Sequence, residues 1–218
     1  THYRYIYPCL PFAFIWCSRL GRSFEFRNFK LSTLTAVALS ATAISSLTVY
    51  PNSISYFNEA AGGPENGFKC LLDSNIAWGQ DLTELANWLR NNNHSQHDLK
   101  AALFTPINPL YYGINFDLPP LSPSFLERHR HADASDGPAP GFYAIDVNYL
   151  QGSRMPIINN DDSIYTIAHD QDFSYFRYFS PVAQVGYSIF IYRVDAAEAN
   201  RVRGLMGLPR LDFKAAAL

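Results

Sequence analysis

The segment YFNEAAGGPENGFKCLLDSNIAWGQDL, residues 56–82, comes just after the uncharged run LSTLTAVALSATAISSLTVY, residues 31–50, and the two together decide how the chain is organised. The run has no Asp, Glu, Lys, Arg or His, and as a helix it would rise about 30 Å, the thickness of a hydrocarbon core. Its many Ser and Thr hydroxyls can bond to helix carbonyls or to a neighbouring helix. The run predicts a membrane-spanning helix; the alternative is a buried helix of a soluble protein.

A second apolar segment, YIYPCLPFAFIWCS at residues 5–18, is shorter and is interrupted by Pro8 and Pro11. Its aromatic residues suit a membrane interface, and prolines are tolerated where helices have neighbours. We therefore interpret it as the last part of an earlier span, which gives one or two N-terminal transmembrane helices. The chain begins with Thr1 and shows no signal-peptide pattern, so we expect it to be the C-terminal fragment of a larger membrane protein.

The loop between these segments, RLGRSFEFRNFK at residues 19–30, predicts the orientation of the chain. It holds Arg19, Arg22, Arg27 and Lys30 against one acid, whereas the next cation after the second span is Lys69. The positive-inside rule places such a loop in the cytoplasm, and everything beyond residue 50 on the extracytoplasmic side. The alternative is a solvated turn of a soluble protein.

The composition of the rest of the chain fits one domain over residues 51–218, which is long enough to bury a core. The net charge of −2 argues against nucleic acid as a partner. The three cysteines give no disulfide framework, and Cys70, in the apolar run FKCLL, is expected to pack in the core.

The periodicity beyond residue 80 predicts an α/β layered domain with a small mixed sheet. Apolar residues at helical spacing predict a helix over residues 82–90, with Asp81 as its N-cap, and a second helix covers residues 196–206. A Pro-, Ser- and His-rich segment at residues 118–140 predicts a flexible exposed loop. Strands are predicted at residues 100–104, 142–147 and 188–194.

The histidines do not predict a metal site. His129 and His131, in the RHRH cluster of that loop, lack the helical spacing of zinc ligands and have no cysteine nearby. A solvated basic patch is the better interpretation of the cluster, and the same holds for His94 and His97. The chain also has no GxxxxGK[ST] phosphate loop and no GxSxG elbow, which disfavours nucleotide-dependent enzymes and serine hydrolases.

Polar and aromatic side chains are concentrated within residues 56–81. Carboxylates and amides that bind hydroxyls, next to aromatic faces on which a ring can stack, are what a sugar requires. The alternative is structural, because Asp and Asn next to helices are often caps and Trp78 can anchor the segment to the core. The candidate substrate-binding residues here are Tyr56, Asn58, Glu59, Asp73, Asn75, Trp78, Gln80 and Asp81.

The order of these features carries a family resemblance. From about residue 2 to residue 194, the chain resembles the C-terminal region of bacterial, planctomycete-type membrane glycosyltransferases of family 39, which are related to the protein O-mannosyltransferases. The most specific parts are YFNE-x-x-GGPENG and DSN-x-x-WGQDL. The other parts are HYRYIYPCLPF before the span, YYGI, GFYAIDVNYLQG and PVAQVGYSIFIY. One departure is Ala77, where similar sequences commonly have an acid.

The resemblance implies transfer of a sugar from a polyprenyl-phosphate carrier to an extracytoplasmic acceptor. In such enzymes the catalytic acid lies in the first extracytoplasmic loop, which this chain does not contain. No catalytic residue is therefore assigned, and the fragment alone is expected to be inactive. Whether a divalent metal assists the full-length enzyme is left open, and no metal ligand is assigned here.

The predicted orientation puts Arg4 and His2 on the same side of the membrane as residues 56–81. We expect Arg4 with His2 to help hold the carrier phosphate, while a role for Arg4 as an interface anchor is the alternative. Two other functions stay open, a membrane-tethered carbohydrate-binding module and a purely structural extracytoplasmic domain. A hydrolase that uses Asp73 and Asp81 is disfavoured, because their spacing sets no defined separation.

Overall fold

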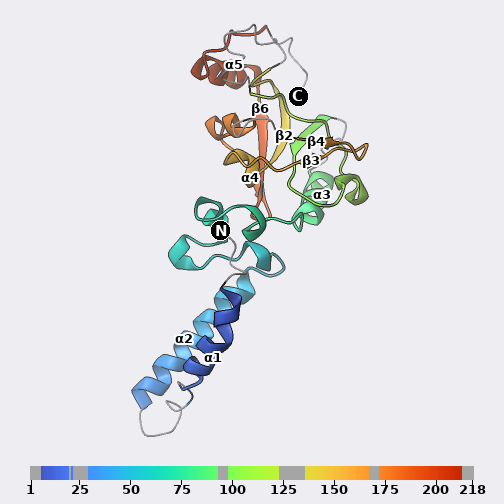
Figure 1. Ribbon diagram of the computed structural model, residues 1–218. Helices are drawn as coiled ribbons and strands as arrows, with labels where there is room; N and C mark the ends of the chain where they lie inside the picture. Colours follow the sequence, from blue (N-terminus) through green and yellow to red (C-terminus); the bar gives the residue numbers. More distant parts are fainter. Residues whose placement is uncertain are drawn as a thin grey trace. The chain divides into compact units, whose positions relative to one another are not determined.

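The computed structural model describes residues 6–19, 21, 29–92, 98–122, 136–166 and 172–212. The chain divides into two compact units, Thr1–Gly67 and Phe68–Leu218. Figure 1 labels α1 and α2 in the first unit, and β2, β3, β4 and β6 with the remaining helices in the second.

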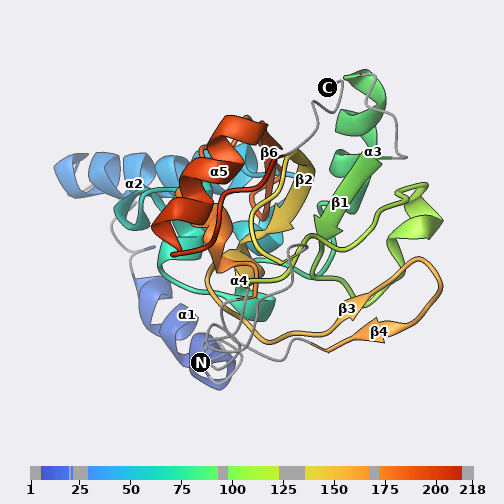
Figure 2. The same cartoon turned by 90° about the horizontal axis from the view of Figure 1, so that it is seen from above.

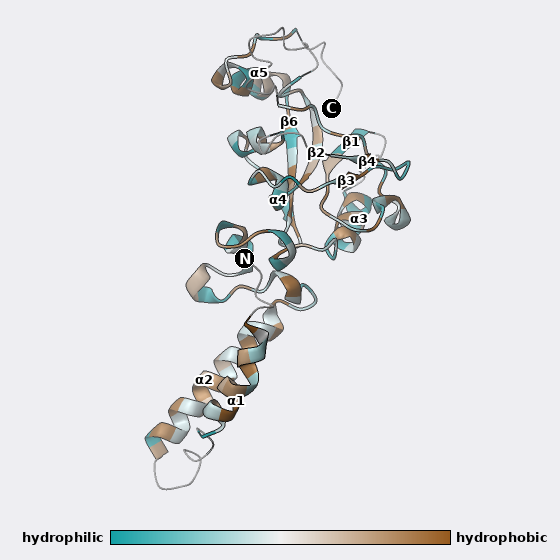
Figure 3. Ribbon diagram, viewed as in Figure 1, coloured by the Kyte–Doolittle hydropathy of each residue, from teal (hydrophilic) through white to brown (hydrophobic). Residues whose placement is uncertain are grey.

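The first unit contains α1 (Leu10–Ser18) and α2 (Phe29–Thr48). α2 begins and ends two residues before the predicted span, and the hydroxyls of Thr33 and Thr42 donate to carbonyls four residues earlier, at 2.9 Å each. Within the part of the chain that the structure describes, α2 is the one helix long and apolar enough to cross a membrane, by length and composition. Figure 3 shows apolar and weakly polar residues along both helices.

Three short 3-10 helices follow α2. Two lie within the first unit and the third crosses its end, and together they shape the backbone around the GGPENG segment. The Cβ that a substitution would add at Gly67 would overlap the ring of Phe57. A glycine is therefore needed for the ring to pack here. The three helices are Ser53–Ser55, Glu59–Ala61 and Pro64–Lys69.

The second unit is built on a four-stranded mixed sheet in the order β1-β2-β6-β5. β1 runs parallel to β2, and β6 is antiparallel to both of its neighbours, so the predicted mixed sheet is confirmed. The three predicted strands are present with shifted ends, whereas β5 and a separate hairpin of β3 and β4 were not predicted. The strands are β1 (Leu99–Ala102), β2 (Gly141–Asp146), β3 (Ile157–Ile158), β4 (Ile164–Tyr165), β5 (Ala183–Val185) and β6 (Ile189–Val194).

The helices of the second unit are α3 (Leu82–Asn91), α4 (Val147–Leu150) and α5 (Ala196–Leu205). α3 and α5 confirm the two helices predicted from periodicity. Figure 2 shows β6, β2 and β1 in that order between α5 and α3. Short 3-10 helices of this unit lie at Asp73–Asn75, Pro109–Tyr112 and Ser174–Tyr178, and another, Tyr7–Cys9, precedes α1 in the first unit.

The core of the second unit combines the aliphatic face of α3 with aromatic rings. Leu85 of α3 and Ile191 of β6 have no exposed surface. The buried Phe176 ring lies 4.9 Å from Tyr143 and 4.5 Å from Tyr175, between ring centroids. The same Phe176 ring lies 5.3 Å from Tyr192 of β6, so the aromatic rings pack against both β2 and β6, and β2 ends at the buried Asp146 described below.

The described ends of the loop predicted at residues 118–140 are anchored. The amide of Gly137 donates to the carbonyl of Leu121 at 2.7 Å, and the buried guanidinium of Arg203 donates to the carbonyls of Asp136 and Pro138. His129 and His131 lie outside the described residues, as do His94 and His97. Cys70 is exposed, so the expectation that it packs in the core was wrong.

Candidate functional site

In the first unit, Tyr56 and Glu59 are brought together by Ser45 of α2. The Tyr56 hydroxyl lies 3.0 Å from Ser45 Oγ. A hydrogen bond with the Ser45 side chain, helped by a backbone bond, lowers the pKa of the Glu59 carboxyl, which is fully exposed. The arrangement keeps an ionised, accessible carboxylate close to the C-terminal end of α2.

Asn58 has a local role in the same segment. Its Oδ1 accepts a hydrogen bond from the Ala61 amide at 3.0 Å, so that it caps the 3-10 helix that follows. Gly62, with φ of 89°, ends that helix in the left-handed conformation that glycine adopts without strain.

In the second unit, Asp73 and Asn75 of the DSN motif shape the backbone before α3. Asp73 has a left-handed φ of 62°, and its amide donates to Oδ1 of Asn148 at 2.6 Å. The Asn75 side chain donates to the carbonyl of Leu72 at 2.8 Å. Asn148, which lies in α4, was not among the predicted site residues.

The WGQ residues form a compact turn. Gln80 Oε1 accepts from the Trp78 amide at 2.7 Å, and its Nε2 donates to the carbonyl of Ile76 at 2.9 Å. Gly79 has φ of 79°, and a Cβ there would lie 2.6 Å from Thr105 Oγ1. Trp78 is half exposed, with its ring centroid 6.0 Å from that of Phe104. Gln80 is thus engaged with the backbone of its own turn, while the Trp78 ring keeps an accessible face.

Ala77 is fully buried beside this turn. An acid at this position would be buried in this fold and would need a partner.

Asp81 occupies the N-cap position of α3, as predicted, but in the described structure its side chain makes no capping hydrogen bond. Its Oδ2 instead accepts hydrogen bonds from the Tyr187 amide at 3.1 Å and from the Ser188 amide and hydroxyl at 3.0 and 2.7 Å. These donors lie in the turn between β5 and β6. Burial raises the pKa of Asp81, with its hydrogen bonds acting against the shift.

The second carboxyl group of this cluster, Asp146, was missed from the sequence. It ends β2 with an exposed fraction of 2%, and burial raises its pKa to about 8. Its Oδ1 accepts from the Asn148 amide at 2.8 Å, and the side chain of Ser188 also bonds to it. The sequence signal was Asp-x-Asn directly after a strand, a pattern typical of a helix N-cap.

Asp81, Asp146, Asn148 and Ser188 form what we call the buried carboxyl cluster. Within the described residues, Oδ1 of Asp81 and Nδ2 of Asn148 are buried without a hydrogen-bond partner. Two carboxyls that share a serine in an enclosed space favour the protonated form of one of them. The cluster links the WGQD turn to the end of β2 and to the β5–β6 turn. Its role is therefore structural.

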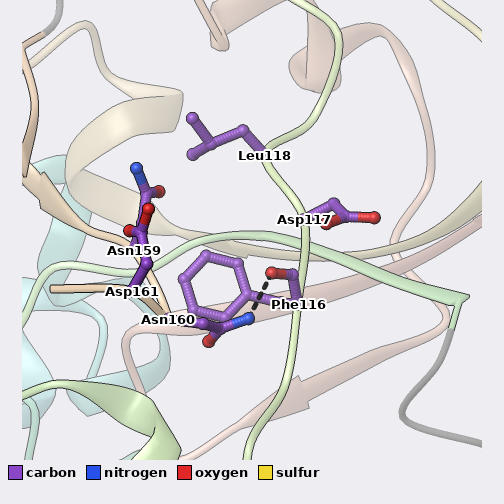
Figure 4. Close-up of a pocket in the computed structure, with 6 residues that line it drawn as sticks. All are labelled: Phe116, Asp117, Leu118, Asn159, Asn160 and Asp161. Atoms are coloured by element: carbon purple, nitrogen blue, oxygen red, sulfur yellow. Dashed lines mark hydrogen bonds between the residues drawn. The ribbon is translucent and has the colours of Figure 1, made fainter. Parts of the chain in front are cut away.

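Among the described residues, a polar depression of about 310 Å³ that is open to solvent lies next to the β3–β4 turn. Figure 4 shows the Leu118 side chain directed toward Asn159 and Asp161, while the Asp117 carboxylate points away from them. The lining residues are Phe116, Asp117, Leu118, Asn159, Asn160 and Asp161.

The depression is held in shape by two amide side chains. The Asn108 amide donates to the carbonyl of Asn159 at 3.1 Å and to Oδ1 of Asp162 at 2.6 Å, and Asn160 Nδ2 donates to the carbonyl of Phe116 at 2.7 Å. Asp161 is exposed, and a hydrogen bond with the Ser163 side chain lowers its pKa. The depression therefore offers a fixed, ionised carboxylate beside amide and apolar groups.

The predicted site residues do not form one described site. Tyr56 and Glu59 meet at Ser45, Asp81 meets Asp146, and Asn58, Asp73, Asn75 and Gln80 serve the local backbone. Arg4 and His2 lie outside the described residues. Among the residues that the structure does describe, no three His, Cys, Asp or Glu side chains group in a way that could hold a metal ion.

Comparisons of the chain with protein-family models, with curated proteins and with solved structures found no match.

Proposed function

We propose that this chain is the membrane-anchored C-terminal region of a glycosyltransferase that moves a sugar from a polyprenyl-phosphate carrier to an extracytoplasmic acceptor. The observation that carries the membrane part is α2, whose apolar side chains are exposed along 20 residues, among them Leu34 at 65% and Leu47 at 72%. Exposed apolar surface of this extent is costly in water and favourable in lipid. The sugar-transfer part rests on the YFNE-x-x-GGPENG and DSN-x-x-WGQDL motifs.

The cations of residues 19–30 support an orientation with the second unit on the extracytoplasmic side. In this proposal Arg4 and His2 hold the carrier phosphate, and the accessible Trp78 contributes to the acceptor side. The buried carboxyl cluster braces the domain, and the transferred sugar meets a catalytic acid that lies outside this chain.

The test is sugar transfer by membranes that contain the full-length gene product, with labelled polyprenyl-phosphate monosaccharides as donors. Arg4→Ala should raise the apparent KM for the lipid donor about tenfold, and Arg4→Lys should raise it less, because a lysine keeps the charge near the phosphate. Arg210→Ala, at an exposed arginine of the second unit, is the matched control. Absence of transfer from every donor would refute the enzyme proposal, and an unchanged KM would refute the role of Arg4.

A second candidate, a membrane-tethered carbohydrate-binding module, is favoured by the depression at the β3–β4 turn. Its volume is at the lower end of the range of ligand pockets, and it combines amide, carboxylate and apolar groups, as sugar sites do. The chain in detergent would then bind glycans on an array, and Asp161→Ala would abolish binding while Glu65→Ala, at an exposed acid, would not. Failure of the wild-type chain to bind any glycan would contradict this candidate.

A further inference from the structure

The second unit presents an exposed apolar loop at residues 107–112, with the sequence INPLYY. Tyr111 is 81% exposed, Leu110 is 49% exposed and Ile107 is 46% exposed. Residues 101–116 contain no charged side chain. Just before the loop, Phe104 packs against the half-exposed Trp78.

The loop is built to hold these side chains outward. The Thr105 hydroxyl accepts from the Ile107 amide at 3.0 Å and donates to the Ile107 carbonyl at 2.9 Å. Asn108, which is 6% exposed, caps the 3-10 helix through the Leu110 amide at 2.9 Å.

Both ends of the loop are fixed to the body of the second unit. Gly113, at φ of 74°, ends the 3-10 helix, and the next residue, Ile114, is completely buried. The side-chain amide of Asn108 also donates hydrogen bonds to the β3–β4 turn. The exposed side chains therefore belong to a fixed surface, and little ordering entropy would be lost when that surface is covered.

We propose that the loop at residues 107–112 inserts into the interfacial layer of a lipid bilayer. Leucine and isoleucine gain by burial in the acyl boundary, and tyrosine and tryptophan prefer the headgroup level, where the ring is apolar and the polar end stays hydrated. Insertion desolvates no charged group of the loop itself, because residues 101–116 have none. We assign lipid as the partner of this loop because α2 of the same chain would already hold the domain at a bilayer. The anchor would raise the local concentration of lipid surface around the loop.

This inference rests on the proposed membrane anchor. The test uses the full chain in native membranes, opened by freeze–thawing so that a polar maleimide reaches both surfaces. Cys9, Cys17 and Cys70 are replaced by serine, and a single cysteine is introduced as Tyr111→Cys. The matched control is Leu205→Cys, at a 63% exposed position of α5. Neither side chain is buried, so both variants are expected to fold.

We expect Tyr111→Cys to react about tenfold more slowly in membranes than after detergent is added, because the interfacial layer excludes the reagent. Leu205→Cys should react at similar rates in both conditions. Equal rates for Tyr111→Cys would overturn the insertion. Protection that persists in detergent would mean that a protein or glycan covers the loop, and would also overturn it. Release of the whole chain by alkaline carbonate would instead refute the membrane anchor itself.

Discussion

Asp81 and Asp195 each stand immediately before a helix, but their carboxylates bind different partners. Asp195 Oδ1 accepts from the Glu198 amide at 2.8 Å, which is a capping bond within its own helix. Asp81 reaches a turn more than 100 residues further along the chain, at Tyr187 and Ser188. The two positions are alike in local sequence context, so the difference comes from the tertiary fold.

Asp81→Ala is expected to lower the free energy of unfolding by about 3 kcal/mol, because it leaves a buried amide, a partly buried amide and a hydroxyl without an acceptor. Asp81→Asn should cost about 1 kcal/mol, since an amide oxygen can take the same bonds. Asp195→Ala, which removes only a cap, should also cost about 1 kcal/mol. Urea unfolding of the full chain in detergent measures all three, and equal losses for Asp81→Ala and Asp195→Ala would contradict the assignment.

Asp146 makes stability depend on pH. Its pKa in the folded chain is raised to about 8, above the value of about 4 of an unfolded chain, so the folded state binds more protons between these values. The stabilisation of the folded state by proton binding to Asp146 is complete below pH 4 and is lost as the pH rises toward 8. The raised pKa of Asp81 acts in the same direction.

We expect the free energy of unfolding to fall from pH 5 to pH 8 by as much as about 1.4 kcal/mol per pH unit. Asp146→Asn keeps the acceptor for the Asn148 amide and should flatten this slope. Asp161→Asn is the control, because the lowered pKa of that exposed carboxyl places its titration below the window. Unfolding curves across the range measure the slope, and an unchanged slope in Asp146→Asn would exclude it as the source.

The turn between β5 and β6 depends on Gly186. Its φ is 55°, and a Cβ at this position would overlap the Asp81 carboxylate. Gly186→Ala should therefore lower the free energy of unfolding by about 3 kcal/mol, from backbone strain and displacement of the carboxylate. Gly207→Ala is matched in backbone strain, with φ of 72° and nothing within 4 Å among the described atoms, and should cost about 1 kcal/mol. Similar melting temperatures for the two variants would show that the Asp81 contact is unimportant.

Elements with a clear period were predictable from the sequence. α3 has apolar residues at helical spacing, and β2 and β6 are short apolar runs between breakers, so their existence followed from local pattern. β3 and β4 have two residues each and carry no period. The β3–β4 hairpin depends on Asn108, which lies about 50 residues earlier and donates side-chain hydrogen bonds to carbonyls of its turn.

The candidate site was less predictable for the same reason. The sequence indicated the DSN and WGQD residues by their density of polar groups, but it could not show that Gln80 bonds to its own turn or that Asp81 lies beside Asp146. Those contacts join segments separated by tens of residues, which no local pattern encodes. The depression at the β3–β4 turn likewise combines residues 116–118 and 159–161, and only the folded chain brings them together.

At the scale of the whole chain, the distribution of cations predicts on which side of the membrane the C-terminal part of the chain lies. A fusion of alkaline phosphatase to the C-terminus in a bacterial host should be active, and a fusion of green fluorescent protein should be dark, because the cations of residues 19–30 favour the cytoplasmic side for that loop. Replacement of Arg19, Arg22, Arg27 and Lys30 by glutamine should produce a mixture of orientations. A bright fluorescent fusion in the wild-type chain would contradict the predicted side.

The membrane anchor itself is tested at the middle of α2. Leu39 is 60% exposed there, and an arginine at the centre of a span costs about 3 kcal/mol, so Leu39→Arg should lower the ratio of carbonate-retained to released chain about 100-fold. Leu205→Arg makes the same change at a 63% exposed position of α5 and should leave retention unchanged. If Leu39→Arg is retained as well as the wild type, α2 does not cross the bilayer. The exposed apolar surface of α2 would then have to be covered by protein.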